Sequence, residues 1–199
     1  MSRAAAIARA HSYFDSGEFL VDLRRRVAIP STSQEPERAS ALHRYLDDEM
    51  VPSLAPLGFT SHVLDNSFGP PFLVAERMED DAAVTVLIYG HGDTVRGLDD
   101  LWRPGLSPWV LTVEGTRIYG RGTADNKGQH SVNIGALAAV IAERGRLGRK
   151  CGRTGEHSLV SSAAQRHREG EENLKVAASA RRGEEDAHRE RSVIGDDQT

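Results

Sequence analysis

Cysteine, aromatic residues and long apolar runs are all scarce in this chain of 199 residues. The single cysteine, Cys151, excludes an internal disulfide framework and fits a reducing compartment. No run approaches the ~20 apolar residues of a membrane span, and the N-terminal segment has no apolar stretch of signal-peptide length. A net charge of −4 gives no basic excess that would attract nucleic acid or an anionic membrane. We therefore expect a soluble, cytoplasmic protein with neither of these partners.

The few aromatic residues, 6% of the chain, are confined to its first part. None follows Tyr119, and residues 149–199 hold 20 charged residues but only six Leu, Ile or Val in 51 positions. Such a segment buries too little apolar area to offset the ~1–2 kcal/mol per residue that backbone ordering costs. The composition predicts two parts: a folded portion over residues 1–148 and a polar tail over residues 149–199 that is disordered or read out of frame.

The first 148 residues alternate helix and strand patterns, which favours an α/β fold. Helical spacing of apolar residues predicts three helices, over residues 19–27, 36–51 and 127–144. Strand patterns occur in four segments, 72–75, 82–89, 110–113 and 117–119, the last two forming a hairpin. Because 82–89 is continuously apolar, both of its faces are expected to be covered. The prediction is a central, mostly parallel sheet with helices on both faces.

Three polar residues lie where such a sheet holds its ligands, beyond the carboxyl ends of strands. His91 and Asp93 directly follow the strongest strand, and Asp125 lies between a glycine-rich turn and the long helix. A neutral imidazole is a good zinc ligand, and a carboxylate two residues away could hold its other ring N–H. Each residue also has a plainer interpretation: a histidine bonded to backbone, a turn aspartate and a helix N-cap.

Two glycine-rich motifs strengthen the metal-site interpretation. They are Gly90-His91-Gly92-Asp93-Thr94-Val95 and, some thirty residues later, Gly120-Arg121-Gly122-Thr123-Ala124-Asp125-Asn126-Lys127-Gly128. Over roughly residues 10–148 the chain resembles the dizinc metallohydrolase family of aminoacylases, acetylornithine deacetylases, succinyl-diaminopimelate desuccinylases and glutamate carboxypeptidases, peptidase family M20. Val27-Ala28-Ile29-Pro30-Ser31 agrees with the segment that follows this family's first helix.

The resemblance implies a role for each of the three polar residues. His91 would bind one zinc ion, Asp93 would orient His91, and Asp125 would bridge two ions through a turn with a cis Asp125-Asn126 peptide bond. Two zinc ions, or cobalt in their place, would activate a water to hydrolyse an amide bond in a small N-acyl amino acid or peptide. The activity implied is that of a deacylase or carboxypeptidase, and the family is homodimeric.

Part of the family's pattern has no counterpart in this chain. The family's adjacent glutamates, a general base and a metal ligand, would fall at Leu159-Val160 by spacing. The later pairs, Glu171-Glu172 and Glu184-Glu185, read as solvated charge runs, so the catalytic role is not transferred to them. The remaining ligands and the dimerisation domain would lie beyond residue 199. We therefore expect a truncated or frameshifted metallohydrolase that is inactive by itself; the alternative is a non-enzymatic fragment.

Overall fold

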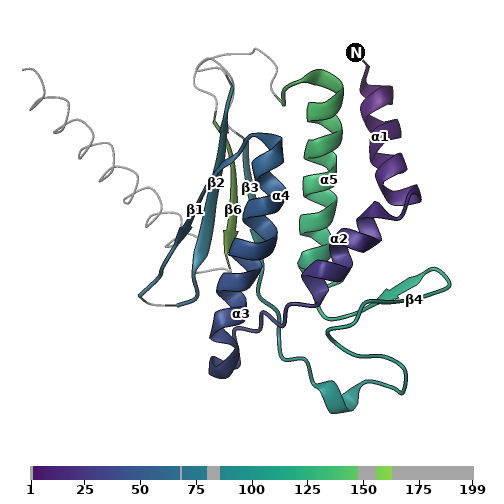
Figure 1. The fold of residues 1–199 in the computed structure, drawn as a ribbon, viewed down its shortest axis with the longest axis vertical. Helices are drawn as coiled ribbons and strands as arrows, with labels where there is room; N and C mark the ends of the chain where they lie inside the picture. The colour runs from purple at the N-terminus through teal and green to yellow at the C-terminus, as the bar shows by residue number, and fades with distance from the viewer. Residues whose placement is uncertain (1, 68, 80–85, 148–155, 163–199) are drawn as a thin grey trace, which may run out of the picture. The chain divides into compact units, whose positions relative to one another are not determined.

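The computed structural model describes residues 2–67, 69–79, 86–147 and 156–162 (Figure 1). The predicted polar tail therefore lies outside the described residues, except for residues 156–162. The same holds for Glu171 and Glu172, and for the first four residues of the strand predicted over 82–89.

Two helices open the chain and pack against the long helix that follows the second motif (Figure 1). Helix α1 (Arg3–Asp15) begins after Ser2, whose hydroxyl accepts a hydrogen bond from the Ala5 backbone N–H at 3.2 Å. It was not predicted from the sequence because its few apolar residues form no stripe, and it has no buried residue. Helix α2 (Glu18–Val27) confirms the first predicted helix, with Phe19, Leu23 and Val27 buried.

The second predicted helix is present but does not end before Pro52. The helical region continues through five short elements: η1 (Pro36–Arg38), α3 (Ala39–Arg44), the π-helical η2 (Tyr45–Met50), α4 (Val51–Leu54) and η3 (Ala55–Leu57). The π-helical turn changes the hydrogen-bond register just before Pro52, which then lies in the first turn of α4. A proline is tolerated there because its missing N–H is not needed.

The main sheet contains four described strands in the order β1 (Thr60–Leu64), β2 (Phe72–Met78), β6 (Glu156–Ser162) and β3 (Val86–His91). The β1–β2 and β2–β6 pairs are antiparallel, and the β6–β3 pair is parallel. The α/β class is confirmed, but the described sheet is mixed rather than mostly parallel. The short connection between β1 and β2 explains part of this, since a parallel pair requires a long crossover.

The expectation that both faces of the 82–89 strand are covered is wrong for its described residues. Val86, Leu87 and Tyr89 have relative exposures of 47%, 51% and 51%. Val86 and Leu87 point to opposite faces of the sheet because side chains alternate along a strand, so each face is partly open. An apolar run predicts burial only where another element packs over it. Helix α5 packs against β3 without covering these three side chains.

The predicted hairpin and the third predicted helix are both present, whereas the short helix before the hairpin was not predicted. Strands β4 (Thr112–Glu114) and β5 (Arg117–Tyr119) form the expected hairpin, and η4 (Asp99–Leu101) precedes it. Helix α5 (Lys127–Arg144) ends at Gly145, which has φ 69° and donates its N–H to the Ile141 carbonyl at 2.7 Å.

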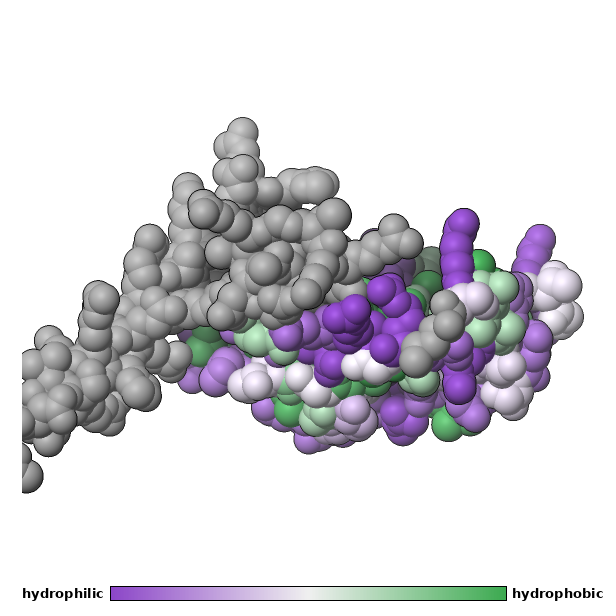
Figure 2. Space-filling model, turned by 90° about the horizontal axis from the view of Figure 1, so that it is seen from above, coloured by the Kyte–Doolittle hydropathy of each residue, from purple (hydrophilic) through white to green (hydrophobic). Residues whose placement is uncertain are grey.

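The core of the described part consists of two apolar clusters. The larger joins the α3–α4 region to β2 and α5 through Leu46, Met50, Leu73 and Ile134. The smaller joins α2 to Leu111 before the hairpin. On the face shown in Figure 2, hydrophilic and hydrophobic side chains are interspersed over the described residues. Among the described helices, none combines the length and apolar character needed to cross a bilayer.

Candidate metal site

The structure brings together the histidine and the aspartate of the two motifs. His91 is the last residue of β3, and Asp125 lies two residues before α5 begins. The Nε2 atom of His91 is 3.0 Å from Oδ1 of Asp125, although the two residues are far apart in the sequence. An imidazole nitrogen and a carboxylate oxygen therefore converge on one point at the carboxyl end of β3.

Asp93 holds the other side of the His91 ring. Nδ1 of His91 donates toward the Asp93 side chain at 3.2 Å and toward the Asp93 backbone carbonyl at 3.1 Å. The plainer interpretation of His91, a bond to backbone, is thus present together with the carboxylate contact. Because Asp93 is fully buried, its carboxylate cannot swing into solvent, and the ring is held with Nε2 facing Asp125.

These two carboxylates favour the charged imidazolium. The hydrogen bond to Asp93 raises the pKa of His91 to about 9, against the lowering effect of burial, and the bond to Asp125 adds to the increase. In the metal-free chain at neutral pH, His91 is therefore an imidazolium between two carboxylates. A metal ion has to displace the Nε2 proton before it can bind this nitrogen.

Asp125 is positioned to face outward. Its side chain is 72% exposed, and the peptide bond to Asn126 is cis, as the family resemblance implies. The N-cap interpretation of Asp125 is wrong, because α5 begins at Lys127 and Asn126 occupies the N-cap position without a capping side-chain bond. The carboxylate is consequently free of a capping role.

Two glycines flank His91 because aromatic rings pack against the backbone there. A Cβ on Gly90 would lie 2.5 Å from Nε2 of His130, and one on Gly92 would lie 2.4 Å from the Tyr45 ring. His130 and Tyr45 stack, with Nδ1 and the hydroxyl oxygen 2.8 Å apart. The glycines of the first motif are thus explained by close packing beneath the site.

The segment that follows α2 lies alongside the His91 turn. Ser31 donates its hydroxyl to the Gly92 carbonyl at 2.7 Å, and its backbone carbonyl accepts the Thr94 N–H at 2.8 Å. Ser33 donates its hydroxyl to Oδ2 of Asp93 at 2.5 Å. The sequence indicated only that residues 27–31 resemble the family, and no role was predicted for the hydroxyl of Ser31 or Ser33.

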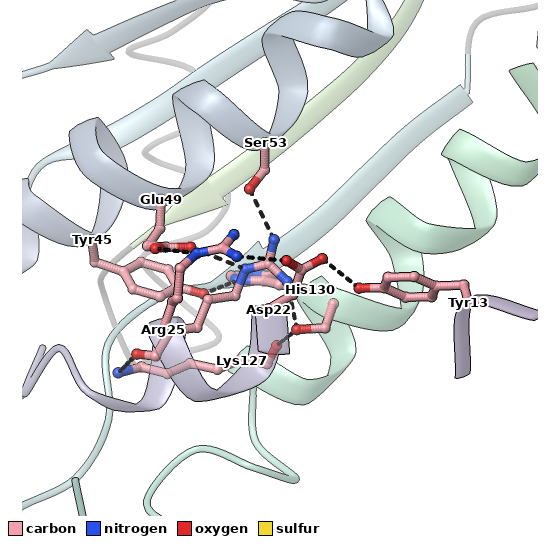
Figure 3. A network of polar contacts seen from close by, with 10 residues as sticks. Tyr13, Asp22, Arg25, Tyr45, Glu49, Ser53, Lys127 and His130 are labelled. Atoms are coloured by element: carbon pink, nitrogen blue, oxygen red, sulfur yellow. Dashed lines mark hydrogen bonds and ion pairs between the residues drawn. The ribbon is translucent and has the colours of Figure 1, made fainter. Parts of the chain in front are cut away.

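A buried polar network lies behind the site and was also missed from the sequence (Figure 3). The fully buried Lys127 donates its ammonium to the carbonyls of Arg26 at 2.9 Å and Ile29 at 2.5 Å. Arg26, equally buried, donates to Ser131 at 2.6 Å and to Ser53 at 2.9 Å. Only Arg26 gave a signal in the sequence, because it lies on the same face of α2 as the buried Phe19 and Leu23.

Burial dominates the titration of this network. It lowers the pKa of Lys127 to about 7 and that of His130 to about 3, the latter with help from the nearby cations, chiefly Arg26. Burial also raises the pKa of Tyr45. His130 is therefore a neutral imidazole at physiological pH, which distinguishes it from His91 a short distance away in the fold.

The described residues bring two potential metal donors together. Zinc sites use three or four protein ligands, whereas two donors converge here. No cluster of three or more potential metal ligands occurs within the described ranges. Ser162, the last residue of β6, is the register partner of His91, so a serine occupies the backbone position next to the histidine. The donor types suit zinc or cobalt, but the described donors do not complete a coordination shell.

Sequence comparison relates the segment that carries these residues to a known family. Residues 87–150 match Peptidase family M20/M25/M40. The chain is 30% identical over 138 residues to the Cys-Gly metallodipeptidase dug1 of Schizosaccharomyces pombe, covering 64% of this chain and 28% of that protein. It is 31% identical over 161 residues to the human Beta-Ala-His dipeptidase, covering 69% of this chain and 30% of that protein. The chain thus spans roughly three tenths of the length of these relatives.

Solved structures agree with the sequence comparison. Human carnosine dipeptidase 1 matches with a TM-score of 0.65 and 28% identity over 80% of this chain and 35% of that one. The di-peptidase Dug1p of Saccharomyces cerevisiae matches with a TM-score of 0.64 and 19% identity over 80% of this chain and 34% of that one, which supports the fold. The predicted family resemblance is confirmed for the N-terminal part of the pattern.

Proposed function

We propose, from the M20/M25/M40 peptidase segment in residues 87–150, that this chain supplies one side of the metal site of a peptide hydrolase. The observation that carries the proposal is the 3.0 Å approach of His91 Nε2 to Asp125 Oδ1, with Asp93 behind the ring. We call this pair of donors the half-site, because His91 and Asp125 would supply only some of the ligands of a two-zinc centre.

Each residue has a distinct chemical task in this proposal. His91 offers Nε2 after losing a proton, and buried Asp93 keeps Nδ1 protonated and the ring oriented. Asp125, with its carboxylate facing solvent, offers both oxygens and so suits a bridge between two ions. Two bound divalent ions would supply an activated water and a polarised scissile carbonyl.

The substrate class that we propose is a dipeptide. The relatives that match this chain carry the names of Cys-Gly and Beta-Ala-His dipeptidases, which favours dipeptides over the N-acyl amino acids also suggested by the sequence. Homodimerisation and a cytoplasmic location stay predictions from the family resemblance and the composition.

The test separates metal binding from hydrolysis. The purified 199-residue chain is titrated with cobalt(II), following its visible absorption, and compared with His91→Ala and Asp125→Ala; the exposed His11→Ala serves as control. We expect weak binding that both site variants abolish and the control retains. Equal binding by all four proteins would contradict the proposed half-site.

A second candidate, a non-enzymatic chain, is favoured by one observation: only two donors converge in the described residues. Hydrolysis of Cys-Gly and Beta-Ala-His by the metal-loaded chain decides between them. We expect negligible turnover from this chain alone, because the general base of the family's pattern has no counterpart among the described residues. Robust turnover that His91→Ala abolishes would show that the chain is a complete enzyme.

A further inference from the structure

We propose that Ser33 is a positioning residue for the metal site, acting through Asp93 on His91. The proposal rests on the proposed function for its purpose, but its geometry stands independently of bound metal. Three groups form a continuous chain of hydrogen bonds. The Ser33 hydroxyl donates to Oδ2 of Asp93 at 2.5 Å, and Nδ1 of His91 donates to Oδ1 at 3.2 Å.

Because Asp93 is buried, loss of the Ser33 hydrogen bond would not be made good by solvent. Asp93 is fully buried, and each of its carboxylate oxygens receives one of these two hydrogen bonds. A buried carboxylate oxygen that loses its donor must find another or rotate. Rotation of the Asp93 carboxylate would withdraw Oδ1 from the His91 ring. The serine hydroxyl therefore fixes the orientation of the Asp93 carboxylate toward the imidazole.

The backbone around Ser33 makes this contact specific rather than incidental. The Thr94 backbone N–H donates to the Ser31 carbonyl, and Thr32 forms a parallel bridge with Thr94; neither contact involves the Ser31 hydroxyl. Residues 31–33 are thereby held beside the turn that follows His91, on the side where Asp93 lies. Ser33 has no freedom to drift away from Asp93 while these backbone contacts hold.

The chain offers variants that isolate the hydroxyl. Ser33→Thr keeps the hydroxyl and adds a methyl group, Ser33→Val has the shape of threonine without the hydroxyl, and Ser33→Ala removes the hydroxyl without adding bulk. Ser31→Ala removes a neighbouring hydroxyl that bonds to backbone and leaves the partners of Asp93 in place. A purely structural role for Ser33 predicts that its variants behave like Ser31→Ala.

The first readout uses the metal-free chain. Proton NMR of the ¹⁵N-histidine-labelled protein follows the Nδ1 proton of His91, identified by its absence in His91→Asn. We expect this proton to exchange with water about tenfold faster in Ser33→Ala and Ser33→Val, because a charge-assisted hydrogen bond that restrains Asp93 is lost. Ser33→Thr and Ser31→Ala should keep the unsubstituted rate.

The second readout is zinc affinity measured by competition with a chelator. We expect Ser33→Ala and Ser33→Val to bind zinc about tenfold more weakly, at the lower end of the effect of groups that orient a metal-bound histidine. Unchanged exchange in both variants, or global unfolding of both, would overturn the proposal and leave Ser33 a structural residue. Altered exchange in a chain that binds no zinc would uphold the positioning role and refute the proposed metal site.

Discussion

His130 makes the stability of this protein sensitive to mild acid. Its pKa is lowered to about 3 by burial and neighbouring cations, whereas an unfolded histidine titrates near 6.5. Between these values the unfolded chain binds a proton that the folded chain does not, so the free energy of unfolding falls as the pH falls. At about 1.4 kcal/mol per pH unit, the loss reaches about 1.4 kcal/mol at pH 5.5 and about 2.7 kcal/mol at pH 4.5.

The other shifted groups do not disturb this window. His91 has a raised pKa of about 9, so its stabilising contribution is fully present below pH 6.5 and is lost only as the pH rises through 9. Lys127 has a lowered pKa of about 7, so its contribution changes between pH 7 and its ordinary value of 10.5. The slope between pH 6.5 and 4.5 therefore reports mainly on His130.

Urea unfolding at half-unit steps from pH 6.5 to 4.5 measures this slope in the metal-free protein. The comparison is with His130→Asn, which does not titrate but can still offer a polar partner to Tyr45, and with His11→Asn at an exposed position of α1. We expect His11→Asn to keep the full slope and His130→Asn to lose it. Parallel slopes in all three proteins would refute the reasoning, since they would show that the buried imidazole does not control acid stability.

Two further substitutions test the packing and the charge pairing behind the site. Gly92→Ala places a methyl group 2.4 Å from the Tyr45 ring and should lower the free energy of unfolding by about 1–3 kcal/mol; an unchanged urea midpoint would contradict this contact. Arg26→Met leaves buried Glu49 without its nearest buried cation, although Arg25 still bonds to it at 3.1 Å. We expect the free energy of unfolding to fall by about 3 kcal/mol in Arg26→Met and to recover in part when Glu49→Gln is added. A further fall in the double variant would show that Arg26 and Glu49 are not coupled.

The elements predicted correctly are those whose signal is local. The bounds of α5 follow from its helical apolar spacing and from Gly145, and the hairpin follows from strand residues around a short turn. The approach of His91 to Asp125 was predictable because two distinctive motifs identify it. In each case the residues that determine the structure lie within or next to the element itself.

The features that could not be predicted depend on contacts between distant segments. The β6–β3 pairing and the exposure of β3 are set by what lies beside and over each strand, which an apolar run does not specify. Ser33 bonds to Asp93, 60 residues away in the sequence, and Lys127 bonds to the Ile29 carbonyl, 98 residues away. Serine and lysine are ordinary surface residues in isolation, so no local pattern distinguishes these two.

The contact of Lys127 with the end of α2 has a consequence for local unfolding. The ammonium at the start of α5 is bonded to carbonyls of Arg26 and Ile29, so the first turn of α5 cannot separate from the last turn of α2 without leaving a buried charge unpaired. Amide hydrogen exchange in these two turns should therefore proceed through one shared opening. We therefore expect the turn that carries Asp125 to open together with the end of α2.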